Sequence, residues 1–285
     1  MKIVRGADEG RRTLLQRQPL GETELPAAIR EKNARIFGGD LSVEQQVRRI
    51  IDDVRRGGDA AVSRYTKAFT GADVTSFEVE RPEIEAAYGH VATDLVASLR
   101  EAAQRIEAYH RRQREHSSRS FSDDGIGMQV RAIERVGMYV PTSPGAVYPS
   151  SVLMTAIPAK VAGVSDLIMM SPAGPDGRVD PLKLVAADIA GVDRVFAAGG
   201  AEAIAALAHG TQTIPRVDKI VGPGNLFVTV AKREVFGAVG IDALYGPSET
   251  IVIADESADP MLAAADLLAQ AEHDELATPI LLTTS

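Results

Sequence analysis

Histidines are the side chains in this sequence best suited to proton transfer or metal binding near neutral pH. There are five of them, and there is no cysteine. His273 stands out because Gln270 precedes it by three residues in an apolar run at helical spacing, which places both side chains on one helix face. A neutral imidazole is a good zinc ligand, and an amide oxygen is a weaker one. The pair indicates either half of a metal site or a histidine that ends a helix as a favourable cation.

The other four histidines are interpreted as structural. His90, His110 and His116 lie in a helical stretch without a second ligand at useful spacing. His209 comes directly before Gly210, where a histidine suits the negative end of a helix dipole. Metal chemistry is therefore expected first around His273.

Composition excludes several kinds of chemistry and partner. Without cysteine, the sequence offers no disulfide, no thiolate nucleophile and no cysteine-based zinc site. It is 45% hydrophobic and 25% charged with a net charge of -8, which is typical of a soluble globular protein and disfavours nucleic acid as a partner. The charged N-terminus differs from a signal peptide, and no apolar run reaches the roughly 18 residues of a membrane span. We therefore expect a cytoplasmic protein with no membrane partner.

The first part of the sequence predicts helices. Residues 1–20 are polar and are expected to form an arm, and the pattern from residue 25 to about residue 116 is helical. Ser42 and Gln45 form a capping box for a helix over 43–56, and Asp59 is predicted to cap a second helix over 60–69. A long helix over 82–115 is predicted to bury one stripe of side chains, and a strand over 128–133 follows. The stripe consists of Leu95, Leu99, Ala102, Ile106 and Tyr109.

From residue 135 onward, strand-like runs alternate with helix-like runs, which predicts βαβ units and a parallel sheet covered by helices. The expected strands are 137–140, 167–171, 194–198, 219–221, 249–254 and 279–283. The expected helices are 151–163, 181–190, 201–208, 226–236 and 260–272. Continuous apolar runs such as DLIMMS and ETIVIA are typical of strands buried on both faces.

Four loops rich in Gly, Pro, Ser or Asn are expected at the carboxyl ends of these strands, where ligands bind in such sheets. They are VPTSPG (140–145), AGG (198–200), GPGN (222–225) and YGPSE (245–249). Backbone amides at a helix N-terminus suit an anionic ligand. The dinucleotide fingerprint G-x-G-x-x-G is absent, and GPGNLF matches only its first half. The loops therefore predict a binding crevice without naming its ligand.

Long stretches of the sequence resemble the histidinol dehydrogenase family. They include VGMYVPTSPGAVYPSSVLMTAIPAKVAGV, AAGGAEAIAALAHGT, VDKIVGPGNLFVTVAKREVFG, IDALYGPSETIVIADES and DLLAQAEHD, and VRRGGDAAVSRYTKAFTG in the N-terminal part. The resemblance implies an alcohol and aldehyde dehydrogenase that makes two hydride transfers to two NAD molecules at one site, with a zinc ion that holds the substrate.

The resemblance assigns roles to particular residues. Tyr139 in GMYVP and Asn225 in GPGN resemble the family's cofactor contacts. Ser248 in GPSE resembles a substrate contact. Gln270 and His273 resemble two of the zinc ligands, and through the metal they belong to the substrate site as well.

Two departures from the family pattern affect the expected chemistry. Glu202 stands in GGAE where the family usually has glutamine against the cofactor. A carboxylate there can accept a ribose hydroxyl but repels a phosphate, or it simply suits the first turn of its helix. The resemblance also places the family's acid–base Glu-His pair, its carboxylate zinc ligand and its last histidine ligand beyond residue 285. No catalytic acid–base residue is therefore assigned within the sequence, and negligible turnover is expected from the 285 residues alone.

The predicted fold class is α/β, with two Rossmann-like parallel-sheet domains, the first preceded by a helical region. The expected division is an arm over 1–20, a first domain from 21–135 with 248–285, and a second domain over 136–247 that carries the cofactor loops. The resemblance implies that the first domain lacks later strands and that the full-length protein is a homodimer.

Three functions stay open. One is the oxidation of L-histidinol through L-histidinaldehyde to L-histidine, a step of histidine biosynthesis. Another is the oxidation of a different small amino or sulfonated alcohol, because VPTSPG and YGPSE differ from the motifs that are most common in the family. The third is a non-catalytic, cofactor-binding fragment that pairs with a fuller subunit.

Overall fold

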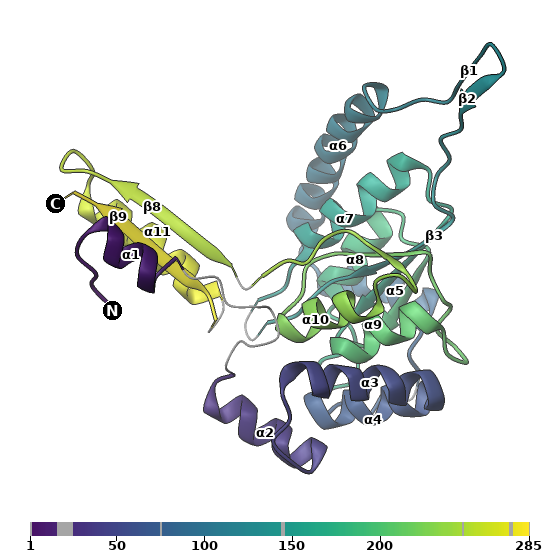
Figure 1. The fold of residues 1–285 in the computed structure, drawn as a ribbon. Coiled ribbons are helices and arrows are strands. Elements are labelled where there is room, and N and C mark those ends of the chain that lie inside the picture. Colours follow the sequence, from purple (N-terminus) through teal and green to yellow (C-terminus); the bar gives the residue numbers. More distant parts are fainter. Residues whose placement is uncertain are drawn as a thin grey trace. The chain divides into compact units, whose positions relative to one another are not determined.

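The computed structural model describes residues 2–15, 25–74, 76–143, 146–246, 248–273 and 276–284, without the side chain of His273. The chain forms two compact units, residues 1–46 and residues 47–285. Figure 1 shows the elements in chain order. No helix among the described residues is both long and apolar enough to span a membrane. The predicted division into an arm and two domains follows other boundaries and stays a prediction.

The first unit is helical. It contains α1 (Ala7–Thr13), α2 (Ala27–Phe37) and the start of α3 (Val43–Gly57). The predicted capping box is confirmed: the Ser42 backbone N–H donates to Gln45 Oε1 at 3.0 Å, and the Gln45 N–H donates to Ser42 Oγ at 3.3 Å. The arm predicted over 1–20 holds α1, which buries no residue.

Both helical stretches predicted early in the second unit are present, but the cap of the first and the continuity of the second differ from the prediction. The helix α4 (Asp59–Thr70) starts at Asp59 itself and is capped by Gly58, whose φ of 55° suits glycine. The long helix predicted over 82–115 is broken into α5 (Arg81–Ala87), the 3-10 turn η1 (Tyr88–His90) and α6 (Thr93–Glu115). The buried face of α6 holds Val96, Leu99 and Ala103, whereas Tyr109 is 65% exposed.

A short hairpin replaces the strand predicted over 128–133. Its strands β1 (Phe121–Asp123) and β2 (Ile126–Met128) pair antiparallel and are exposed along their whole length. Asp124 and Gly125 form the turn with positive φ, as two-residue hairpin turns require.

The core is a parallel five-stranded sheet with the order β5-β4-β3-β6-β7. Each strand before β7 is followed by a helix, so the predicted βαβ pattern and α/β class are confirmed. Helices α7 and α8 cover one face, and α9 and α10 cover the other (Figure 1). The elements are β3 (Arg135–Tyr139), α7 (Pro149–Ala162), β4 (Asp166–Ser171), α8 (Pro181–Ile189), β5 (Arg194–Ala197), α9 (Gly200–His209), β6 (Lys219–Val221), α10 (Leu226–Val235) and β7 (Gly240–Ile241).

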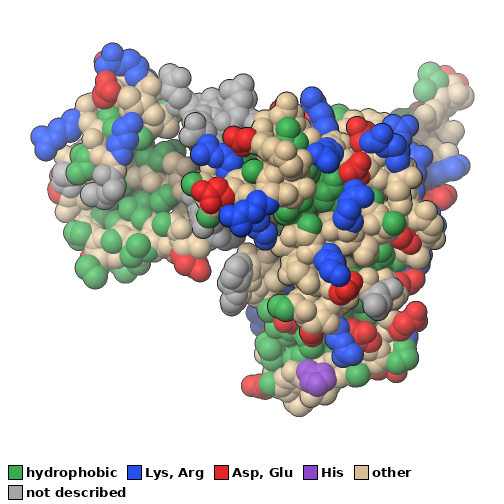
Figure 2. Space-filling view, turned by 90° about the horizontal axis from the view of Figure 1, so that it is seen from below, with side chains coloured by type: hydrophobic (Ala, Val, Ile, Leu, Met, Phe, Trp, Pro, Cys, Tyr) green, Lys and Arg blue, Asp and Glu red, His purple; other side chains and the backbone are tan. Residues whose placement is uncertain are grey.

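Burial on both faces is confirmed for the central strands but not for the last two. In β4, every residue after Asp166 is buried. The strands β8 (Glu249–Ala254) and β9 (Thr278–Thr283) pair parallel around α11 (Pro260–His273) as a separate two-stranded sheet. Ile253 is 81% exposed and Leu268 is 68% exposed, and Figure 2 shows hydrophobic side chains on the surface of this segment. The prediction that ETIVIA is buried on both faces is therefore wrong in this structure.

Candidate functional site

The sheet order creates a switch point between β3 and β6. The chain runs outward from β3 to β4 and β5 on one side, then returns to β6 and β7 on the other. Ligands of open α/β sheets bind outside the carboxyl ends of the strands at such a point. Because the strands are parallel, the predicted loops after β3, β5 and β6 meet at this one edge. Three of the four predicted crevice loops are thus brought together.

Tyr139 is held at the centre of this edge. It is the last residue of β3 and is 3% exposed. Its hydroxyl accepts a hydrogen bond of 3.1 Å from the backbone N–H of Gly200, the first residue of α9. Burial raises the pKa of Tyr139, and the charge of Glu202 raises it further, so the phenol is neutral at physiological pH. Tyr139 therefore offers a fixed O–H group where β3 meets the loop after β5.

Glu202 lies in the first turn of α9 and is 2% exposed. Its Oε2 has no hydrogen-bond partner among the described residues. Burial raises the pKa of Glu202 to about 8, against a smaller opposing effect of its own backbone N–H. The side chain is therefore mainly a neutral carboxylic acid at pH 7, and the phosphate repulsion expected of a carboxylate is weak there.

Asn225 is the N-cap of α10. Its Oδ1 accepts a hydrogen bond of 3.1 Å from the backbone N–H of Val228, while the residue stays exposed to solvent. The loop before it passes very close to β3: a Cβ on Gly222 would lie 2.3 Å from the carbonyl oxygen of Tyr139, and the φ of Gly222 is 110°. Glycine is required here, and it brings Asn225 to the edge that holds Tyr139 and Glu202.

Two buried lysines brace this edge, and the sequence analysis did not find them. Lys183 on α8 donates to the carbonyl of Pro141 at 2.6 Å, to Thr142 Oγ1 at 2.7 Å and to Ser171 Oγ at 3.0 Å. Lys232 on α10 donates to the carbonyl of Gly222 at 3.0 Å and pairs with Asp242.

The signal for these lysines was a lysine placed among apolar residues of a mostly apolar helix, in PLKLVAADI and LFVTVAKREV. Such a charge is usually explained by a long side chain that reaches solvent. Both residues are instead buried, Lys183 at 0% exposed and Lys232 at 2%.

Ser248 and Gln270 lie together in a second cleft, of about 510 Å³. Thr250 also lines it and donates its hydroxyl to Gln270 Oε1 at 2.8 Å, which fixes the orientation of the amide. His273 is the last residue of α11, one turn after Gln270, and its side chain lies outside the described part of the chain. The structure thus brings one predicted substrate contact and one predicted metal ligand together.

The described residues do not complete a metal site. No group of three histidine, aspartate or glutamate side chains among them could hold a metal ion. Zinc in proteins usually has four ligands, and Gln270 supplies one weak oxygen donor. These residues alone do not fit a complete zinc site.

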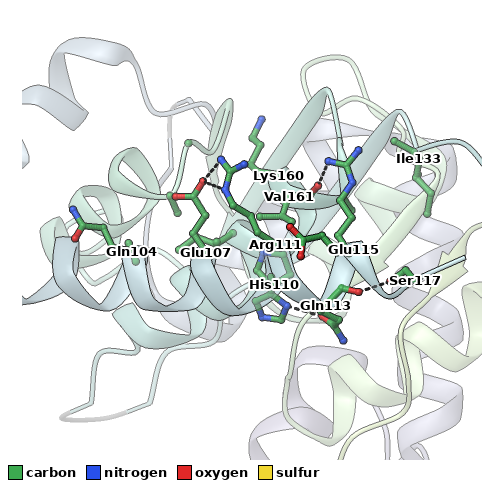
Figure 3. Close-up of a pocket in the computed structure, with 18 of the residues that line it drawn as sticks. Gln104, Glu107, His110, Arg111, Gln113, Glu115, Ser117, Ile133, Lys160 and Val161 are labelled. Atoms are coloured by element: carbon green, nitrogen blue, oxygen red, sulfur yellow. Dashed lines mark hydrogen bonds and ion pairs between the residues drawn. The ribbon is translucent and has the colours of Figure 1, made fainter. Parts of the chain in front are cut away.

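A larger groove, of about 1550 Å³, contains none of the predicted site residues. It is lined by α6, the segment after it and the ends of α7 and α8 (Figure 3). Its charged side chains largely satisfy one another or the backbone: Arg111 donates to Glu107 at 3.0 Å, and Arg114 donates to the carbonyl of Val161 at 2.7 Å. The groove lies by the amino ends of the strands, away from the switch point, and it is not chosen as the site.

Comparison with known proteins identifies the family. A sequence model described as histidinol dehydrogenase matches residues 37–285. The histidinol dehydrogenase of Dehalococcoides mccartyi is 49% identical over 289 residues, which cover 100% of this chain and 64% of the relative. That of Clostridium acetobutylicum is 52% identical over 248 residues, which cover 86% of this chain and 57% of the relative.

A solved structure agrees with these matches. The crystal structure of histidinol dehydrogenase from Elizabethkingia anophelis has a TM-score of 0.75 and 36% sequence identity, and the match covers 92% of this chain and 61% of that one. The chain therefore spans about three fifths of the length of the relatives it matches. The agreement of the family model, the sequence identity and the fold shows that this chain belongs to the histidinol dehydrogenase family.

Proposed function

We propose that this chain forms the cofactor-binding part, and a portion of the substrate-binding part, of an NAD- and zinc-dependent dehydrogenase. The whole protein would oxidise L-histidinol through L-histidinaldehyde to L-histidine in the cytoplasm, as a homodimer. Family membership supports the reaction, because the matched relatives are histidinol dehydrogenases. The observation that carries the proposal is the meeting of Tyr139, Glu202 and Asn225 at the switch point.

The residues at this edge fit a dinucleotide. Tyr139 presents a neutral hydroxyl, and Glu202 at pH 7 presents a neutral acid with one unpartnered oxygen. Hydroxyl and acid groups suit the ribose and amide groups of NAD, and the backbone amides of the loops at this edge suit its pyrophosphate. When bound, NAD accepts the hydride. The protein residues bind it, fix its orientation and exclude water from the crevice floor.

For zinc, the proposal is limited to Gln270 and His273 as two of the ligands. Thr250 supports this role because its hydroxyl donates to the amide oxygen of Gln270, which occupies one lone pair and fixes the amide's orientation. Ser248 lines the same cleft and is proposed to hydrogen-bond the substrate. Because the described residues offer an incomplete donor set, we expect the 285-residue polypeptide to hold zinc only weakly.

The 285-residue polypeptide is expected to bind NAD but to form almost no NADH from L-histidinol. Binding is proposed to need Tyr139, Glu202 and Asn225 at the switch point, whereas turnover needs a base for the protons released and a complete metal shell. Calorimetry with NAD and with ZnCl₂ measures binding, and absorbance at the NADH band measures turnover. The full-length enzyme of Dehalococcoides mccartyi serves as the positive control for the assay.

Different outcomes separate the alternatives. Absence of NAD binding by a folded sample contradicts the proposed cofactor role, and robust NADH formation contradicts the expected lack of turnover. NADH formation from other amino or sulfonated alcohols, but not from histidinol, assigns a different substrate within the family. Binding of NAD, with no turnover beyond that of a full-length relative when the two are mixed, supports a non-catalytic fragment.

A further inference from the structure

Lys183 is a buried cation without a counter-ion among the described residues. It is 0% exposed, and its ammonium group donates to three neutral oxygens: the Pro141 carbonyl, Thr142 Oγ1 and Ser171 Oγ. All three of its protons are therefore used. No carboxylate in the described part of the chain lies within ion-pair distance of it. Burying a charge in this way costs free energy, and an anion that binds from outside would offset part of that cost.

The three acceptors place this charge beneath the crevice. Pro141 and Thr142 belong to the loop that follows β3, and Ser171 is the last residue of β4. Thr142 is itself exposed, so a single residue separates the ammonium group from solvent at this edge. The loop after the first strand is where a doubly wound sheet receives the phosphates of a dinucleotide.

The contrast with Lys232 shows that the missing partner is specific to Lys183. Lys232 lies under the neighbouring loop after β6, is equally buried and is neutralised by Asp242. The only charge that acts on Lys183 within the described chain is that of Asp180, whose carboxylate caps α8 by accepting from the Leu182 N–H at 2.8 Å. The groups that face Lys183 from β4 and from the loop after β3 are neutral.

We propose that Lys183 is a positioning residue for the cofactor: its buried positive charge, held against the loop after β3, attracts the pyrophosphate of NAD to that loop. This inference rests on the proposed function. It assigns part of the affinity for NAD to Lys183, in addition to the contacts predicted for Tyr139, Glu202 and Asn225.

Lys183→Met tests the role of the charge, because methionine is nearly the same length and keeps the core filled. NAD, which carries a pyrophosphate, is expected to bind about tenfold more weakly to the variant, as a unit charge one residue layer away implies. Adenosine, which is uncharged, is expected to bind equally to both proteins. The matched control is Lys219→Met, which removes a lysine from the start of β6, at the opposite edge of the same sheet, and should leave both affinities unchanged.

The pH dependence of the affinity for NAD distinguishes an effect of the Lys183 charge from an effect on the shape of the loop. Burial lowers the pKa of Lys183 to about 8, while Asp180 opposes this shift. The affinity for NAD should therefore fall as the pH rises through 8, since the ammonium group then loses its proton. Glu202 ionises in the same range, so the profile is measured in a Glu202→Gln background, where Lys183→Met should abolish it.

Each outcome decides something. If the wild type binds no NAD, the proposed function fails first. If the wild type binds NAD and Lys183→Met binds it equally well, the inference alone is wrong. If Lys183→Met is shown by urea unfolding to be folded and binds NAD and adenosine equally more weakly, Lys183 only shapes the loop. That result would overturn the role of the charge.

Discussion

Replacing Glu202 with glutamine is expected to stabilise the protein by about 5 kcal/mol above pH 8 and to leave its stability unchanged below pH 4.5. Burial raises the pKa of this carboxyl from 4.5 to about 8 in the folded protein. The unfolded chain therefore releases the proton at a lower pH than the folded protein does. Stability present below pH 4.5 is lost progressively as the pH rises to 8. Glutamine does not ionise, so the variant escapes this loss.

The measurement is urea unfolding of both proteins at pH 4.5, 7 and 9. The difference in unfolding free energy should be near zero at the lowest pH and should grow with pH. Glu256→Gln provides the control, because Glu256 is exposed and removing its charge should change the unfolding free energy little. A Glu202→Gln variant that is equally stable to the wild type at pH 9 would show that water or a local rearrangement solvates the carboxylate.

The second large effect is expected at Lys232. Lys232→Met should destabilise the protein by about 3 kcal/mol, because it leaves Asp242 without its partner in a site where the lysine is 2% exposed and the aspartate 19%. The same change removes the hydrogen bond to the Gly222 carbonyl and the contact with the Tyr245 ring, whose centroid lies 5.2 Å from Nζ. The loop that carries Asn225 should then bind NAD more weakly.

A double-mutant cycle identifies the cause of this loss. Asp242→Asn removes the unpaired charge but can still accept from the Gly222 N–H, a hydrogen bond of 2.8 Å in this structure. The double variant should therefore regain part of the stability lost in Lys232→Met. The exposed pair Arg105–Glu101 is the control, and Arg105→Met should change stability by less than about 0.5 kcal/mol. A double variant no more stable than the single one would assign the loss to packing.

The central sheet was predictable from sequence because its strands are continuous apolar runs separated by helices of regular length. The run in β4, DLIMMS, is buried as predicted. The run in β8, ETIVIA, has the same texture but alternate residues are exposed, because burial depends on what covers a strand rather than on its own composition. The sequence pattern predicts such a strand, but it does not predict which elements pack against its two faces.

The site was predictable where single residues define it and not where distant groups meet. Tyr139, Glu202 and Asn225 lie at one edge as expected, since parallel strands end together. The neutral state of Glu202 was not foreseen, because it follows from burial by helix packing and not from the residues beside it in the chain. Lys183 meets its acceptors across 41 and 42 residues toward the N-terminus, and no local pattern indicates that contact.

The two buried groups at this edge give the crevice a proton-linked electrostatic character. The pKa of Lys183 and that of Glu202 are both near 8, yet one group is a cation when protonated and the other is neutral. Across that pH the floor of the crevice passes from net positive to net negative, a change of two charges at one sheet edge. An anion that enters at this edge favours the protonated form of both groups, so its binding takes up protons from the buffer.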